Sequence, residues 1–218
     1  MKKILAVFLL LLAVGCGNTK TTTNNFKEEY EKLNGKIDEN NQTEYVYMEI
    51  DENNPFVYIK VDEVIKKLQE GTSVIYFGFP ECPWCRNLVP VLIDAANELG
   101  VDKIYYYNAV KIRDTKELDK DGNIITTKEG TKEYREIIDI LYDYLPVYSG
   151  LNDDTIKRLY LPTVVFIKDG KITYLHTGTL DSQEDPYKKL TTEQYNELKK
   201  ILSDNLNEVF EIVCDDAC

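Results

Sequence analysis

The stretch FGFPECPWCR, residues 77–86, decides how this chain folds. It ends an apolar run that predicts a buried strand over residues 73–79, and it opens a segment that predicts a helix over residues 82–99, stopped by Gly100. Cys82 and Cys85 therefore lie in the first turn of the predicted helix. The reactive form of cysteine is the thiolate, and the unpaired amide groups of a helix start stabilise its negative charge. The pattern favours thiol chemistry.

The two residues between the cysteines suit that chemistry. Pro83 removes an amide donor that would have no partner at this position, and Trp84 offers an apolar surface for gripping a partner polypeptide. However, a C-x-x-C pair is also half of a zinc site, which Cys214 and Cys218 could complete. The rest of the chain must decide between exchange and metal binding.

The segments on either side of this stretch indicate an α/β fold. Alternating and apolar runs predict strands, and apolar residues at helical spacing predict helices, in the order strand, helix, strand, helix, strand. That order predicts parallel strands covered by helices. The hairpin signature Asp169-Gly170 joins two later strands. We expect strands over residues 44–50, 56–60, 104–110, 163–168 and 171–176, and helices over residues 26–35, 61–69 and 190–210.

Residues 111–160 interrupt the pattern and exceed an ordinary connection in length. They are charged and contain one good helical pattern, with apolar residues on one face between Tyr134 and Leu145. We expect an inserted helical cap beside the cysteines that sets the choice of partner.

Two motifs in the right order resemble the thioredoxin family. Residues 77–86 with Pro90 resemble its active-site helix, and Leu161-Pro162-Thr163 with Gly170 and Gly178 resembles its cis-proline segment. The resemblance implies a thioredoxin-like three-layer fold, a mixed central sheet with flanking helices, with the helical insertion placed before the cis-proline strand. It also implies that Pro162 and Leu161 face the reactive Cys82 and bind the partner's backbone.

The site also departs from that family. Tyr76 stands where thioredoxins carry a buried aspartate, and a phenol that titrates near ~10 cannot act as a base at neutral pH. Glu81 should raise the pKa of Cys82, and Arg86 should lower it. The direction of catalysis therefore stays open.

The N-terminus predicts export and anchoring. A basic start and an apolar run over residues 4–14 indicate a signal peptide, residues 1–15, and Ala13-Val14-Gly15-Cys16 resembles a bacterial lipobox. Cys16 would be lipidated, residues 16–25 would form a flexible tether, and residues 26–218 would form the domain. A conventional secretory signal and an uncleaved anchor are the alternatives, and all three place the domain outside the cytoplasm. A lipoprotein signal with C-P-W-C and a long insertion is also similar to the thioredoxin-like proteins called bacteriocin transport accessory proteins.

The remaining features limit the function. With 38 acidic against 26 basic residues, the chain would repel nucleic acid. Cys214 and Cys218 suit a structural disulfide, a second redox pair or free thiols. His176, the single histidine, suits an ordinary structural role.

The leading hypothesis is a thiol–disulfide oxidoreductase that acts on secreted or surface proteins. Cys82 would attack and Cys85 would resolve, with a redox partner protein and no cofactor beyond the Cys82–Cys85 disulfide. The alternative is a non-catalytic accessory lipoprotein that binds an exported peptide or transporter.

Overall fold

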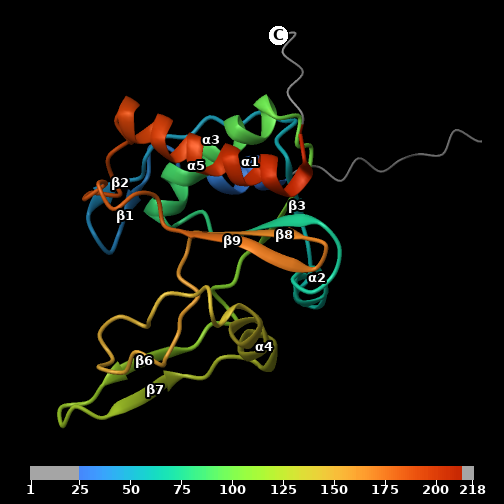
Figure 1. Ribbon diagram of the computed structural model, residues 1–218. Helices are drawn as coiled ribbons and strands as arrows, with labels where there is room; N and C mark the ends of the chain where they lie inside the picture. Colours follow the sequence, from blue (N-terminus) through green and yellow to red (C-terminus); the bar gives the residue numbers. More distant parts are fainter. Residues whose placement is uncertain (1–24, 213–218) are drawn as a thin grey trace, which may run out of the picture.

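The computed structural model describes residues 25–212, which form a mixed α/β fold (Figure 1). A five-stranded mixed sheet is at its centre, in the order β3-β5-β4-β8-β9. The strands are β3 (Phe56–Tyr58), β5 (Ile104–Tyr107), β4 (Ser73–Phe77), β8 (Thr163–Lys168) and β9 (Lys171–Thr177). β3, β5 and β4 run parallel, as the strand–helix order predicts, and β8 and β9 are antiparallel additions.

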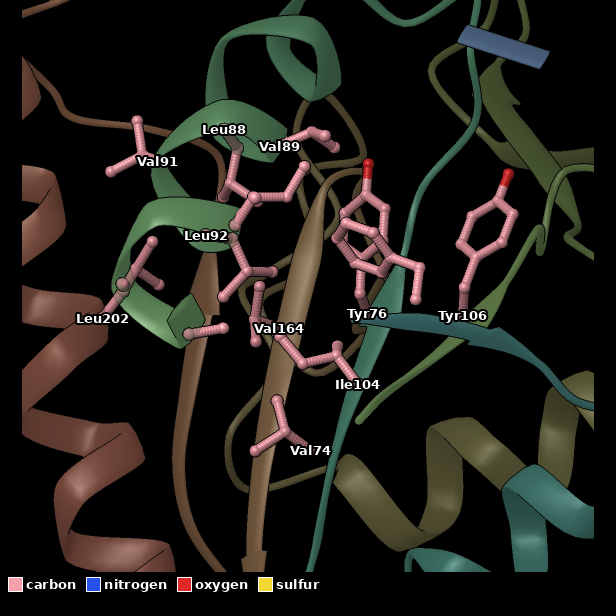
Figure 2. Close-up of a cluster of buried hydrophobic side chains, with 14 of the residues drawn as sticks. Val74, Tyr76, Leu88, Val89, Val91, Leu92, Ile104, Tyr106, Val164 and Leu202 are labelled. Carbon is pink, nitrogen blue, oxygen red and sulfur yellow. The ribbon is translucent and has the colours of Figure 1, made fainter. Parts of the chain in front are cut away.

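Helices cover both faces of this sheet. α1 (Asn25–Glu31), α3 (Pro83–Glu98) and α5 (Thr192–Phe210) pack on one face, and α2 (Val61–Lys67) and α4 (Lys132–Leu141) pack on the other. Successive residues of a strand point to opposite faces. Val74 and Tyr76 of β4 therefore join the first core, where Figure 2 shows them with residues of α3 and α5. Ile75 and Phe77 join the second core.

The turn between β8 and β9 confirms the hairpin expected at Asp169-Gly170. Both residues have positive φ, 50° and 72°, which the favoured two-residue hairpin turn requires. Glycine is also needed for space, because a Cβ on Gly170 would lie 2.5 Å from the carbonyl oxygen of Gln69. The turn consequently packs tightly against the loop that precedes β4.

The strand expected over residues 44–50 is wrong. A short hairpin, β1 (Ile37–Asp38) and β2 (Thr43–Glu44), ends before it, and residues 45–50 pair with no strand between residues 25 and 212. Side chains take the partner strand's place: Asn34 bonds both backbone groups of Met48, and the amide of Ile50 donates to Glu31. The alternating pattern is real, but side chains of α1, of the loop after it and of α3 supply the hydrogen bonds.

The inserted segment, residues 111–160, is not the helical cap that the sequence suggests. It contains one helix, α4, and also an exposed hairpin of β6 (Thr115–Leu118) and β7 (Ile124–Lys128). α4 buries Tyr134, Ile137 and Leu141 against α2 and the face of the sheet opposite α3.

No helix within residues 25–212 is long and apolar enough to cross a membrane. The expected signal peptide and Cys16 fall in residues 1–24, and Cys214 and Cys218 fall in residues 213–218. All of these lie outside the described residues.

Candidate active site

Cys82 caps the N-terminus of α3. Its sulfur accepts a hydrogen bond from the backbone N–H of Cys85 at 3.2 Å, and Pro83 occupies the first turn, where its missing N–H costs nothing. Only 4% of Cys82 is exposed. The start of the helix thus aims an amide donor at the sulfur, as the sequence predicts.

The surroundings of Cys82 favour its thiolate. Burial opposes the charge, but hydrogen bonds from the Cys85 side chain and from the N–H groups of Cys85 and Trp84 outweigh it, and Arg113 adds a positive charge. Together they hold the pKa of Cys82 below its ordinary value. Cys82 is consequently the better nucleophile of the pair at neutral pH.

Cys85, one turn further along α3, is placed in the opposite way. It is fully buried, and burial together with the neighbouring Cys82 raises the pKa of its thiol well above the ordinary value. The backbone N–H of Phe79 and the hydroxyl of Tyr76 oppose that rise. Both cysteines are free thiols here, and they form an asymmetric pair.

The segment before β8 faces the first sulfur. The Leu161–Pro162 peptide bond is cis, as the resemblance implies, and the Cys82 thiol donates to the carbonyl oxygen of Leu161 at 3.4 Å. The carbonyl of Pro162 accepts from the N–H of Gly178 at 2.9 Å, which ties this segment to the end of β9. Residues 79 positions apart in the chain therefore meet at the reactive thiol.

A pocket of about 340 Å³ opens beside this junction. Trp84 and Leu161, two residues singled out from the sequence, line it together with Tyr160 and Leu180. Tyr160 is the last residue of the insertion, so one end of that segment does reach the site. Thr177, Thr179 and Gln183 add polar groups to the lining.

Arg86 has a structural role at the site. Its guanidinium is fully buried and donates to the carbonyl oxygens of Val46 and Tyr30 and to Oδ1 of Asn34, each at 2.8 Å. Glu81 is exposed. The leading influences on the Cys82 pKa include neither residue, so the expected opposition of Glu81 and Arg86 stays a prediction.

Arg113 is the residue that sequence reasoning missed. It lies 31 positions after Cys82 in the chain, and in the fold its charge acts on the thiolate. A second cation, Arg158, lies close enough to lower the pKa of Arg113, after burial, which is the larger cause. No spacing rule links Arg113 to Cys82, because only the path of the insertion brings them together.

Two other sequence expectations concern metal and histidine. Within residues 25–212 no group of three or more His, Cys, Asp or Glu side chains could hold a metal ion. The four-cysteine zinc site is untested, because Cys214 and Cys218 lie outside that range. His176 is buried, and its Nε2 lies 3.0 Å from the carbonyl oxygen of Thr179, which suits the expected structural role.

Comparisons with known proteins add no identification. No protein-family model matches the chain, and no curated protein is significantly similar to it. The functional argument therefore depends on the geometry of the site.

Proposed function

We propose that this protein is a thiol–disulfide oxidoreductase with a thioredoxin-like fold. The observation that carries the proposal is the asymmetry of the pair, with a low-pKa Cys82 at a helix start and a fully buried, high-pKa Cys85 one turn away. A structural pair of cysteines needs no such difference. The cis peptide bond at Leu161–Pro162 and the mixed sheet are consistent with the thioredoxin resemblance.

The exchange runs in two steps when a partner disulfide is reduced. The Cys82 thiolate attacks one partner sulfur, a Cys82–partner disulfide forms, and the other partner sulfur leaves as a thiolate. Cys85 then loses its proton, which the departed thiolate takes up through solvent, and its sulfur attacks Cys82. The partner's second thiolate leaves, so the partner disulfide has gained two electrons and the pair Cys82–Cys85 has lost them. Oxidation of a dithiol partner is the same sequence reversed.

The pocket beside Trp84 is the proposed place for the partner chain. An extended peptide whose disulfide reaches Cys82 would lie against Trp84 and Leu180 and could donate a backbone N–H to the Leu161 carbonyl, which the Cys82 thiol now occupies. Backbone contacts of this kind favour proteins and peptides of varied sequence over one small molecule.

The proposed location is the outer face of a bacterial membrane, through a lipid on Cys16, where disulfides persist. The support is the lipobox-like segment of the sequence. Replacing Cys16 by Ala should move the protein from the membrane fraction to the soluble fraction. Retention of the variant in the membrane would favour an uncleaved anchor.

Trapping tests the proposed reaction. Cys85→Ser should accumulate mixed disulfides with exported proteins, because Cys82 still attacks and nothing resolves the product. The matched control, Cys82→Ser, keeps the buried thiol and should trap nothing. If Cys85→Ser also captures nothing while still binding peptides, the alternative of a non-catalytic accessory lipoprotein is favoured.

A further inference from the structure

A second pocket, of about 390 Å³, opens beside the loop that leads into Cys82. Phe79 and Glu81 of that loop line it, and the N–H of Cys82 donates to the carbonyl oxygen of Phe79 at 3.2 Å. This second pocket shares no lining residue with the pocket beside Trp84. It is therefore a separate space next to the reactive thiol, and no step of the proposed exchange uses it.

The order of the strands places the two pockets on either side of the strand that leads into Cys82. Tyrosines at the ends of β3 and β5 line the second pocket, whereas residues beside the start of β8 and the end of β9 line the pocket beside Trp84. β4 lies between these two pairs of strands. Phe77, the last residue of β4, pairs with Tyr107 of β5 and with Thr163 of β8, so both pockets lie at the same edge of the sheet. A partner chain that crosses Cys82 along this edge would pass both.

The second pocket carries more negative than positive charge. Its lining includes the carboxylates of Glu29, which is half-buried on α1, and of Glu81, which is exposed, against one exposed cation, Lys111. Within residues 25–212 none of these three side chains forms an ion pair. The charge of the pocket is consequently complementary to a cation.

Aromatic rings form walls beside these carboxylates. Tyr58 is 44% exposed, and Tyr106, which is 1% exposed, lies edge-on to it with ring centroids 5.0 Å apart. The buried hydroxyl of Tyr106 has no hydrogen-bond partner among the described residues. Burial, and after it Glu29, raise the pKa of both tyrosines, in keeping with a carboxylate beside the rings. Carboxylates next to aromatic faces suit an ammonium or guanidinium group on an apolar stem.

We propose that the second pocket is a specificity site that receives a lysine or arginine side chain of the partner protein. The inference rests on the proposed exchange reaction and defines its substrate class as disulfides flanked by a basic residue. The stem of that residue would lie against Tyr58 and Phe79, and its cation would lie near the carboxylates of Glu29 and Glu81.

The sheet also indicates where the basic residue lies in the partner. β3 is two strands away from β4, which is about 10 Å at the usual spacing of strands. An extended chain covers that distance in about three residues. The basic residue should therefore lie about three positions from the partner cysteine.

Two peptide disulfides test the proposal. Each is a symmetric dimer linked through one cysteine, with lysine or with glutamine three positions to either side of it. The full-length protein is reduced and mixed with each peptide at low salt, and the rate of peptide reduction is followed by acid quenching and mass spectrometry. The readout is the ratio of the lysine rate to the glutamine rate, divided by the same ratio for dithiothreitol. This division removes differences in the peptides' own reactivity, and the ratio is insensitive to changes in the reactivity of Cys82.

The wild-type protein should prefer the lysine peptide by about fivefold or more, and the preference should shrink at high salt. Glu29→Gln/Glu81→Gln should abolish the preference. The matched control Glu136→Gln/Glu197→Gln removes two exposed carboxylates, on α4 and α5, and should keep it. Equal rates for the two peptides in the wild type, or an equal loss in the control variant, would overturn the proposal. If neither peptide is reduced, the exchange reaction itself is wrong, and that outcome is distinct.

A charge reversal separates a specific site from damage to the fold. Glu81→Lys, at an exposed position, should raise the rate with a peptide that carries glutamate at the same places, relative to the glutamine peptide. Glu136→Lys should not raise it. A gain of rate cannot come from a loss of folding, so it would support the site directly. An unchanged ratio in Glu81→Lys would count against the proposal.

Discussion

The surroundings of Cys82 and of Cys85 differ although only two residues separate them. Cys82 lies at the end of α3 among amide donors, a carbonyl and the charge of Arg113, so its pKa falls. Cys85 faces the core among buried aromatic side chains, so its pKa rises. The comparison teaches that the helix start activates one thiol while the interior restrains the other. In the proposed exchange, Cys82 attacks first and Cys85 attacks second, and this difference in pKa suits that order.

Arg86 follows Cys85 on α3, and replacing it should have the largest effect of the substitutions considered, on the stability of the protein. In Arg86→Met, the carbonyls of Tyr30 and Val46 and the Asn34 side chain lose their buried donor. We expect the free energy of unfolding to fall by about 3 kcal/mol, measured by urea denaturation. The control Lys200→Met breaks only an exposed ion pair with Asp204 and should cost less than about 1 kcal/mol. Equal losses in the two variants would refute the structural role of Arg86.

A partner disulfide must reach Cys82, and changing the pocket beside it should have an intermediate effect on the rate of reaction. Trp84→Ala removes an apolar wall of the pocket beside Cys82. Reaction with a peptide disulfide should slow by about tenfold, whereas reaction with a small disulfide should not change. Tyr174→Ala, at an exposed position of β9, serves as the control. A loss of rate with both substrates would mean that Trp84 affects the thiol itself.

The smallest effect should come from Arg113. Removing its charge in Arg113→Gln should raise the pKa of Cys82 and leave the pKa of Cys85 unchanged, with a shift that shrinks at high salt. The pH dependence of Cys82 alkylation measures it, and Arg135→Gln, a cation on α4, is the control. An unchanged pH dependence of Cys82 alkylation at low salt would show that the charge of Arg113 does not act on Cys82.

Local features of the site could be predicted from the sequence. The apolar run before Cys82 and the helical pattern after it put both cysteines in the first turn of α3, and the Asp169-Gly170 turn was likewise evident. These features depend on residues close together in the chain. The meeting of Cys82 with Leu161 also followed, but through the thioredoxin resemblance and not from spacing.

Features that depend on distant side chains could not be predicted. Residues 45–50 have the pattern of a strand, yet their backbone groups bond to Asn34, Glu31 and Arg86. A sequence pattern reports which residues are buried and not which atoms accept their hydrogen bonds. For the same reason Tyr76 could be recognised as a departure, but its partner Tyr30, 46 residues earlier, could not.

The measurement that tests the account most directly is the pH profile of alkylation of each thiol in the reduced wild-type protein. Peptide mass spectrometry after brief alkylation reports Cys82 and Cys85 separately. The account predicts that Cys82 reacts with a midpoint below the ordinary cysteine pKa and that Cys85 reacts only well above it, because the thiolate is the reactive form. Coincident midpoints, or a lower midpoint for Cys85, would contradict the division of roles between the two cysteines.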